Sequence, residues 1–158
     1  MKRIIAILLA MTMILSCVGC GNKKDGTLGQ TLLQDFQAKM TENPTQTAQE
    51  LADGILTNEA ILFPGASMAV EPGLLTGFDN AEITGFKEGV MFSPMMGTIP
   101  FVGYIFVLED GADVEAFKTT LKENANPRWN ICTEAEETVV ESVENTVLFL
   151  MCPVTLEE

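Results

Sequence analysis

Two segments of the chain repeat apolar residues at the spacing of an amphipathic helix. The first opens at Thr27, which matches a capping box with Gln30, and its apolar face is Leu28, Leu32, Phe36 and Met40. Pro44 ends this segment. The second opens at Thr47, which repeats the capping signature with Glu50, and its apolar face is Ala48, Leu51, Ala52, Ile55 and Leu56. Both helices need a partner surface for these faces.

That surface is expected to be a sheet. Residues 67–71 and 81–86 are short candidate strands. Residues 101–109 form a longer one, whose unbroken apolar run suits a central strand that is buried on both faces.

A third helix and a hairpin follow. After the turn Asp110-Gly111, one helical face is Val114, Phe117 and Leu121, and the other is Glu115, Lys118 and Lys122. Two β-branched strands at 138–143 and 146–152 are joined by Glu144-Asn145, where Asn145 suits the positive φ of a tight hairpin. The order ααβββαββ predicts one α+β domain over residues 27–158, in which about three amphipathic helices pack on a mainly antiparallel sheet of four to five strands.

Residues 89–108 carry no charge over twenty positions, which raises the question of a membrane span. Repeated Pro and Gly argue against one, and so does the lack of flanking Lys and Arg. We expect the stretch to divide into the strand that ends at Leu108 and a loop over residues 93–100. Met95 and Met96 in this loop either fold back to plug the core or stay exposed as an adaptable contact for a partner.

The first 20 residues have the pattern of an export signal. Lys2 and Arg3 precede an uncharged apolar run over residues 4–15, and twelve helical residues cover only about 18 Å of a hydrocarbon core of about 30 Å. The following residues, Leu15-Ser16-Cys17-Val18-Gly19-Cys20, resemble the lipobox of bacterial lipoproteins. The resemblance implies a signal peptide over residues 1–19, fatty acyl chains such as palmitate on Cys20, and a tether over residues 20–26. Cys17 is the alternative attachment site.

The net charge of the protein limits the classes of molecule that it can bind. The formal net charge is −13, and removal of Lys2 and Arg3 with the signal makes it −15. This acidic balance argues against nucleic acid as a partner and against a face of the domain that lies on the membrane, because both require clustered basic residues. We expect two partners. One is the extracytoplasmic face of the membrane, which the protein contacts through its lipid anchor, and the other is an unidentified protein or small molecule.

The segment from Gly103 to Lys118, with its Asp110-Gly111-Ala112-Asp113 turn, and the hairpin that follows resemble an uncharacterised family of Gram-positive bacterial lipoproteins. The resemblance covers residues 48–152 and implies a cell-envelope location and an α+β fold. The family brings no activity or catalytic residue with it.

Catalytic chemistry has little support in the sequence. The chain contains no histidine, which removes the commonest general base and zinc ligand. The carboxylate pairs Asp79 with Glu82 and Glu109 with Asp113 are the remaining acid-base candidates. The 109–113 turn lacks the ligand spacing of a calcium loop, so we expect Asp110 or Asp113 to cap a helix there. No cofactor, metal or catalytic residue is predicted.

Two cysteines remain once the signal and the anchor are set aside. An exported domain permits a disulfide between Cys132 and Cys152, and two reduced, buried thiols are the alternative.

Two function classes follow from the sequence. One is a lipid-anchored, non-catalytic interaction or ligand-binding module, and the other is a carboxylate-based envelope enzyme, with or without a metal. A deep pocket with two or more inward acids would favour the enzyme.

Overall fold

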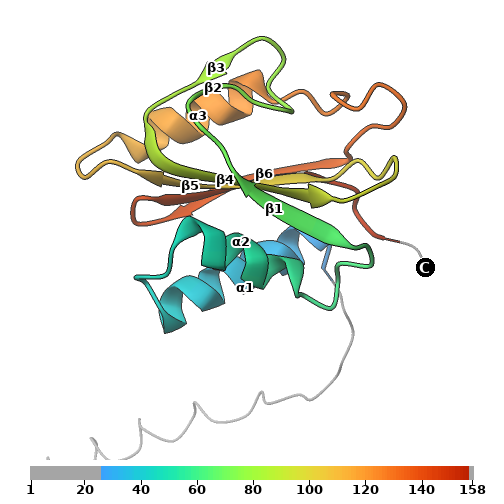
Figure 1. The fold of residues 1–158 in the computed structure, drawn as a ribbon, viewed down its shortest axis with the longest axis horizontal. Coiled ribbons are helices and arrows are strands. Elements are labelled where there is room, and N and C mark those ends of the chain that lie inside the picture. The colour runs from blue at the N-terminus through green and yellow to red at the C-terminus, as the bar shows by residue number, and fades with distance from the viewer. Residues whose placement is uncertain (1–25, 157–158) are drawn as a thin grey trace, which may run out of the picture.

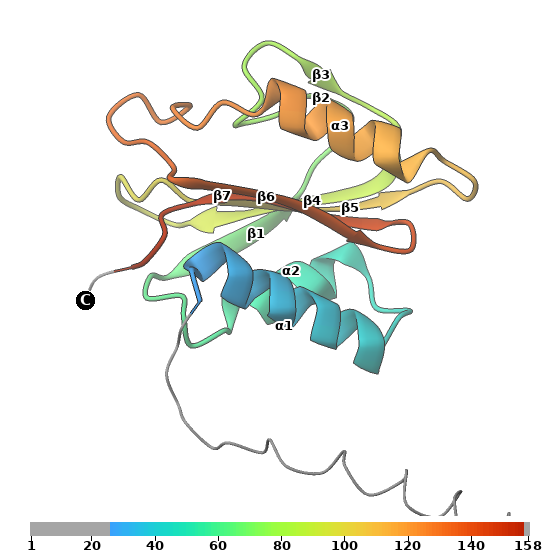
Figure 2. The ribbon, with the colours of Figure 1, turned by 180° about the vertical axis from the view of Figure 1, so that it is seen from behind.

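The fold has three layers, with a sheet between two helical layers (Figure 1). The structure is a computed structural model that describes residues 26–156. Helices α1 and α2 cover one face of a five-stranded sheet, and α3 lies over the other face beside a two-stranded sheet, as the opposite view also shows (Figure 2). The elements in chain order are α1 (Leu28–Glu42), α2 (Ala48–Leu56), β1 (Gly65–Ala69), β2 (Gly73–Leu74), β3 (Glu82–Ile83), β4 (Phe86–Pro94), β5 (Val102–Leu108), α3 (Val114–Asn124), β6 (Glu137–Val143) and β7 (Thr146–Cys152).

This architecture confirms the predicted α+β class. Within residues 26–156 three helices pack on a five-stranded sheet whose order is β1-β4-β5-β7-β6, and every neighbouring pair is antiparallel. The predicted export signal, with Cys17 and Cys20, lies outside the described residues.

Strand β5 is central and buried on both faces, as its unbroken apolar run predicted. Its alternate side chains enter two separate cores: Ile105 packs under α1 and α2, while Tyr104 and Phe106 pack under α3. A larger residue than Gly103 would not fit in β5, because a Cβ at that position would overlap the ring of Phe92 on β4. The two cores explain why helices cover both faces of the sheet.

The first core is built on the predicted helical faces. Leu28, Leu32, Phe36 and Met40 of α1 are all buried, and so are Ala48, Leu51, Ala52 and Ile55 of α2. Both parts of the Thr47–Glu50 capping box are present. Thr27 caps α1 by accepting a hydrogen bond from the Gln30 amide at 3.2 Å, and its hydroxyl donates to Glu137 of β6 at 2.6 Å. The start of the domain is therefore fixed to the edge of the sheet.

The strand pattern between residues 65 and 94 differs from the prediction. No single strand covers residues 81–86 as expected: Glu82 and Ile83 pair with β2 outside the main sheet, and Phe86 already belongs to the next strand. Gly85, with φ 93°, turns the chain after them. The unpredicted strand β4 then begins at Phe86 and pairs with both β1 and β5.

Residues 89–108 do divide as expected, although their loop is shorter than predicted. Ser93 and Pro94 belong to β4, so the connection to β5 begins at Met95. Within residues 26–156, no helix has both the length and the apolar composition that crossing a bilayer requires.

Two further expectations on local structure are corrected. Lys118 was placed on the exposed face of α3, but it is buried and its ammonium lies 3.1 Å from Glu115 and 3.2 Å from Glu141 of β6. The neighbouring strand supplies a partner charge that helical periodicity does not report. In the hairpin turn, Glu144 and not Asn145 has the positive φ, 54°. Asn145 instead donates its side-chain amide to the Leu108 carbonyl at 2.9 Å.

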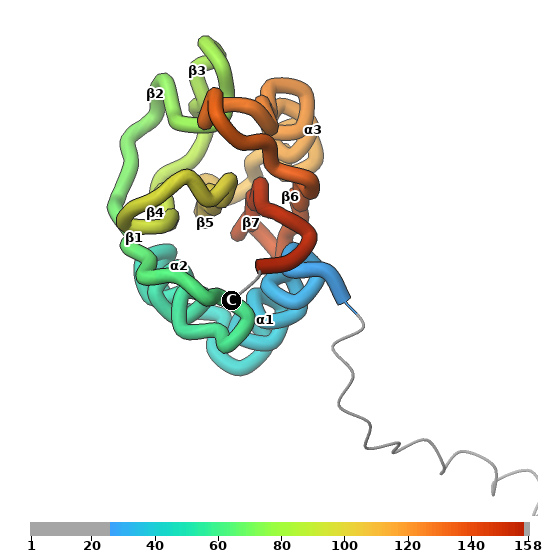
Figure 3. The backbone as a smooth tube through the Cα atoms, turned by 90° about the vertical axis from the view of Figure 1, so that its right-hand side faces the viewer, coloured from blue at the N-terminus to red at the C-terminus, as the bar shows by residue number. Residues whose placement is uncertain are grey.

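Three loops meet at one end of the sheet, which Figure 3 views directly. They are the α2–β1 loop, the β4–β5 loop and the α3–β6 loop, and the residues after β7 lie beside them. Gly26, the first described residue, is at the same end. The opposite end carries the β5–α3 connection and the β6–β7 turn.

Candidate functional site

Met95 and Met96 are exposed at the tip of the β4–β5 loop. Their relative exposures are 64% and 80%, so the core-plug interpretation is wrong and the exposed-contact interpretation remains. The Met95 amide donates to the Pro64 carbonyl at 2.9 Å, and the buried Phe101 ring anchors the other end of the loop. Gly97, with φ 102°, supplies the turn between these anchors. The loop therefore holds the two methionines away from the core.

Three more large apolar side chains are exposed at this end of the sheet. Leu62 lies in the α2–β1 loop and is 48% exposed, Ile131 lies in the α3–β6 loop and is 86% exposed, and Val154 follows β7 and is 36% exposed. We call these three residues, together with Met95 and Met96, the apolar end surface. Of the seven large hydrophobic residues exposed among residues 26–156, five belong to it; the others are Met68 and Leu74.

Hydrogen bonds connect the loops that carry this surface. The Thr133 hydroxyl of the α3–β6 loop donates to the Thr98 carbonyl of the β4–β5 loop at 2.9 Å. The Leu28 amide at the start of α1 donates to the Val154 carbonyl at 2.8 Å. With the bond from Met95 to Pro64, these contacts link the three loops to one another, and the start of the domain to the segment after β7. Leu28, Leu62 and Val154 line one hollow, so the two groups meet at this end.

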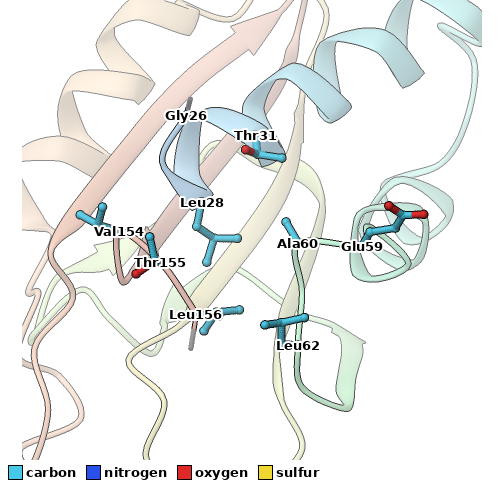
Figure 4. A pocket seen from close by; sticks show the side chains of 9 residues that line it. All are labelled: Gly26, Leu28, Thr31, Glu59, Ala60, Leu62, Val154, Thr155 and Leu156. Atoms are coloured by element: carbon cyan, nitrogen blue, oxygen red, sulfur yellow. The ribbon is translucent and has the colours of Figure 1, made fainter. Parts of the chain in front are cut away.

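A hollow of about 170 Å³ opens beside Gly26 at the same end (Figure 4). Leu28, Leu62 and Leu156 stand around it, whereas the carboxylate of Glu59, its one acidic lining residue, points away. Pockets that enclose drug-sized ligands usually measure about 300–1,000 Å³. The hollow is therefore too small to enclose such a ligand.

Among residues 26–156, the acidic residues do not converge in a deep pocket. A hollow of about 250 Å³ beside β1 and β4 is lined by Glu71, Lys87 and Glu88, and all three are exposed. Another of about 350 Å³ contains Asp79 as its one acid, and Asp79 accepts a hydrogen bond from the Asn126 amide. Neither arrangement supplies the inward pair of carboxylates that the carboxylate-based enzyme hypothesis calls for.

The 109–113 turn caps a helix. The Asp113 carboxylate accepts a hydrogen bond from the Ala116 amide at 3.0 Å, as predicted for a cap of α3. The Asp110 side chain is almost fully exposed and lies 4.0 Å from Lys87. Among residues 26–156, no group of three or more Cys, Asp or Glu residues is arranged to hold a metal ion.

The two cysteines of the domain are free thiols in the structure. Cys132 is exposed in the α3–β6 loop, and Cys152 is buried at the end of β7. Burial, with smaller contributions from the charges of Glu137 and Glu136, raises the pKa of the Cys152 thiol to about 12. Cys152 is therefore protonated at neutral pH and packs as a small apolar side chain.

Two other ionisable groups are buried on the side of the sheet that α3 covers: Tyr104 in the second core and Lys118 between α3 and β6. Burial raises the pKa of Tyr104 above its ordinary range, and its hydroxyl donates to the Thr76 carbonyl at 2.8 Å. For Lys118, burial lowers the pKa, but the hydrogen bonds and charges of Glu115 and Glu141 outweigh it and raise the pKa. Both groups hold elements together and neither faces a hollow.

Of the five residues of the apolar end surface, only Met95 and Met96 were predicted from the sequence as a possible contact site. Leu62, Ile131 and Val154 were not predicted, because each is a single apolar residue in a loop without periodicity. One sequence feature could have indicated Leu62: it lies in an uncharged run, residues 60–70, like the run 89–108 that contains the two methionines. Comparison of the chain with protein-family models, with curated proteins and with solved structures found no match.

Proposed function

We propose that this protein is a lipoprotein of the bacterial cell envelope whose folded domain acts by binding and not by catalysis. Residues 1–19 direct export, Cys20 carries the acyl chains, and residues 20–26 tether the domain to the extracytoplasmic face of the cell membrane. Cys17 is the alternative attachment site. The lipobox-like sequence and the resemblance to Gram-positive lipoproteins support this location.

The exposed apolar end surface is the observation that carries the proposal for binding. Contiguous apolar side chains on a soluble protein mark contact sites, because their exposure to water costs free energy that a partner removes. Methionines suit such a contact, since their flexible, polarisable side chains adapt to different surfaces. The partner class remains a protein, a small molecule or the membrane, and not nucleic acid. A carboxylate-based enzyme has less support, because the acids of the described residues line shallow, exposed surfaces.

Mass spectrometry of the mature N-terminus tests the anchor. The full chain is expressed in a Gram-positive host, the membrane fraction is digested, and the N-terminal peptide is identified. We expect an acylated peptide that begins at Cys20. Two acyl chains hold a protein stably on a bilayer, so the wild-type protein should remain in the membrane fraction.

Cys20→Ser and Cys17→Ser are matched variants for this experiment. Cys20→Ser should lose the acyl chains and leave the membrane fraction, whereas Cys17→Ser should remain acylated and anchored. The opposite result would move the attachment site to Cys17. An unmodified N-terminus in the wild-type protein would refute lipid anchoring.

A further inference from the structure

We infer that the apolar end surface rests on the outer surface of the bilayer to which the protein is anchored, so that the domain has a fixed orientation with its opposite end directed away from the membrane. This inference rests on the proposed acylation of Cys20, and it names the lipid surface as the occupant of the site described above. Four observations carry it.

The first is the length of the tether. Gly26 is six residues beyond Cys20, and six extended residues span about 20 Å at most. Gly26 lies beside Leu62 and Val154, two members of the apolar end surface. The chain therefore leaves the domain at this surface, and the anchor holds the same end close to the bilayer.

The second observation is the distribution of charge. The chain carries 9 basic and 22 acidic residues, yet residues 60–70 and 89–108 contain none of them. Each run contributes one of the loops at this end, although the two are far apart in the sequence. Apart from Glu59 at the start of the α2–β1 loop, these two loops bring no carboxylate toward the lipid headgroups.

One ion pair and one hydrogen bond engage part of the charge close to the surface. Arg128 lies 3.7 Å from Glu134 in the α3–β6 loop, and the Glu136 carboxylate accepts a hydrogen bond from the Val154 amide at 2.9 Å. Glu59 remains exposed, with its carboxylate turned away from the hollow. Lys23 and Lys24 in the tether add positive charge next to the bilayer, where anionic lipid attracts it.

The shape of the surface distinguishes a bilayer from a protein partner. A protein partner that docks as a helix or a peptide lies in a hydrophobic groove. Met96 and Ile131 are at least 80% exposed, so they stand out from the domain and do not line a groove. Separate protruding apolar tips, carried on loops beside a lipid anchor, match insertion between headgroups.

The single tryptophan of the chain is placed to test this contact. Trp129 is partly buried in the α3–β6 loop, two residues before Ile131. The mature acylated protein is reconstituted into vesicles of phosphatidylethanolamine and phosphatidylglycerol, some of which carry bromine on the acyl chains near the headgroup. We expect these bromolipids to quench the fluorescence of Trp129, because the quenching requires close contact with the lipid.

Met95→Ser with Met96→Ser, and separately Ile131→Ser, should each lose most of this quenching. Met68→Ser and Leu74→Ser are the matched controls, since both residues are exposed and apolar but lie outside the end surface. In these two variants the bromolipids should quench Trp129 fluorescence as strongly as in the wild type. Thermal melting of every variant verifies that the fold is intact.

An unquenched wild-type protein overturns the inference, and so does equal quenching in the surface variants and their controls. Mass spectrometry of the same samples separates this failure from failure of the proposed anchor, because an acylated Cys20 with an unquenched Trp129 refutes only the orientation. Sedimentation in detergent identifies the other occupant: a dimer that Met95→Ser with Met96→Ser dissociates would assign the surface to a second copy of the chain and overturn the inference.

Discussion

Replacing Met95 and Met96 together with Ser is expected to leave the stability of the fold nearly unchanged. Their side chains are 64% and 80% exposed, so only about a third of the first and a fifth of the second leave water on folding. Full burial of a methionine side chain contributes about 2 kcal/mol, so the double variant should lose about 1 kcal/mol of unfolding free energy at most. The new hydroxyls stay in water and add no penalty for an unpaired polar group.

Met40 provides the matched control for this measurement. It is 3% exposed in the core between α1 and the sheet, so Met40→Ser leaves a cavity and a buried hydroxyl. Its cost is about 3–5 kcal/mol. Urea unfolding of the chain without its first 20 residues, followed by circular dichroism, compares the variants at equal m-values. If the double variant lost as much stability as Met40→Ser, the two methionines would be core residues and the apolar end surface would not exist.

Three further predictions concern groups that the structure places but the sequence did not. Lys118→Met should lower the free energy of unfolding by about 1 kcal/mol near neutral pH, because Glu141 loses its partner. The pKa of Lys118 is raised in the folded state, so its contribution to stability is present below pH 10.5 and is lost as pH rises through the folded pKa. The unfolding free energies of wild type and variant should therefore converge in alkaline denaturation. Maleimide should label Cys132 in the native domain and Cys152 only after unfolding, because burial raises the pKa of Cys152 to about 12; rapid native labelling of both thiols would contradict this. Glu144→Gly should raise stability by about 1 kcal/mol by relieving a positive φ of 54°, and a lower melting temperature would contradict the assigned turn.

The sequence predicted elements whose residues repeat with one clear period. Helices α1 and α2 combine an apolar face with a capping threonine, and β5 is an unbroken apolar run. In each case the local signal and the tertiary environment agree. These elements supply most of the first core, which is why the fold class was predictable.

Strand β4 was not predictable in the same way. Its burial pattern is irregular, with a register shift between Phe86 and Glu88, and Gly89 and Pro94 within it indicate a break in regular structure. It is a strand because β1 and β5 supply hydrogen-bonding partners on both sides. That pairing depends on contacts distant in the sequence.

The candidate site was only partly predictable for a related reason. The sequence indicated that Met95 and Met96 lie in a loop, but their exposure depends on the bond from the Met95 amide to the Pro64 carbonyl, which holds the loop away from the core. Ile131 belongs to no periodic pattern, and only the fold brings it to the same end. The connected surface is a property of the topology.

The central claim is that the domain is anchored at Cys20 and lies on the bilayer with its apolar end surface. Hydrogen–deuterium exchange of the acylated wild-type protein on vesicles, compared with unacylated Cys20→Ser in solution, tests it most directly. Amides of the loops at residues 57–64, 95–101 and 125–136 should exchange more slowly on vesicles, while those of the opposite end, at residues 109–113 and 144–145, should be unchanged. Equal exchange in both states at all five segments, or protection confined to the opposite end, would contradict the claim.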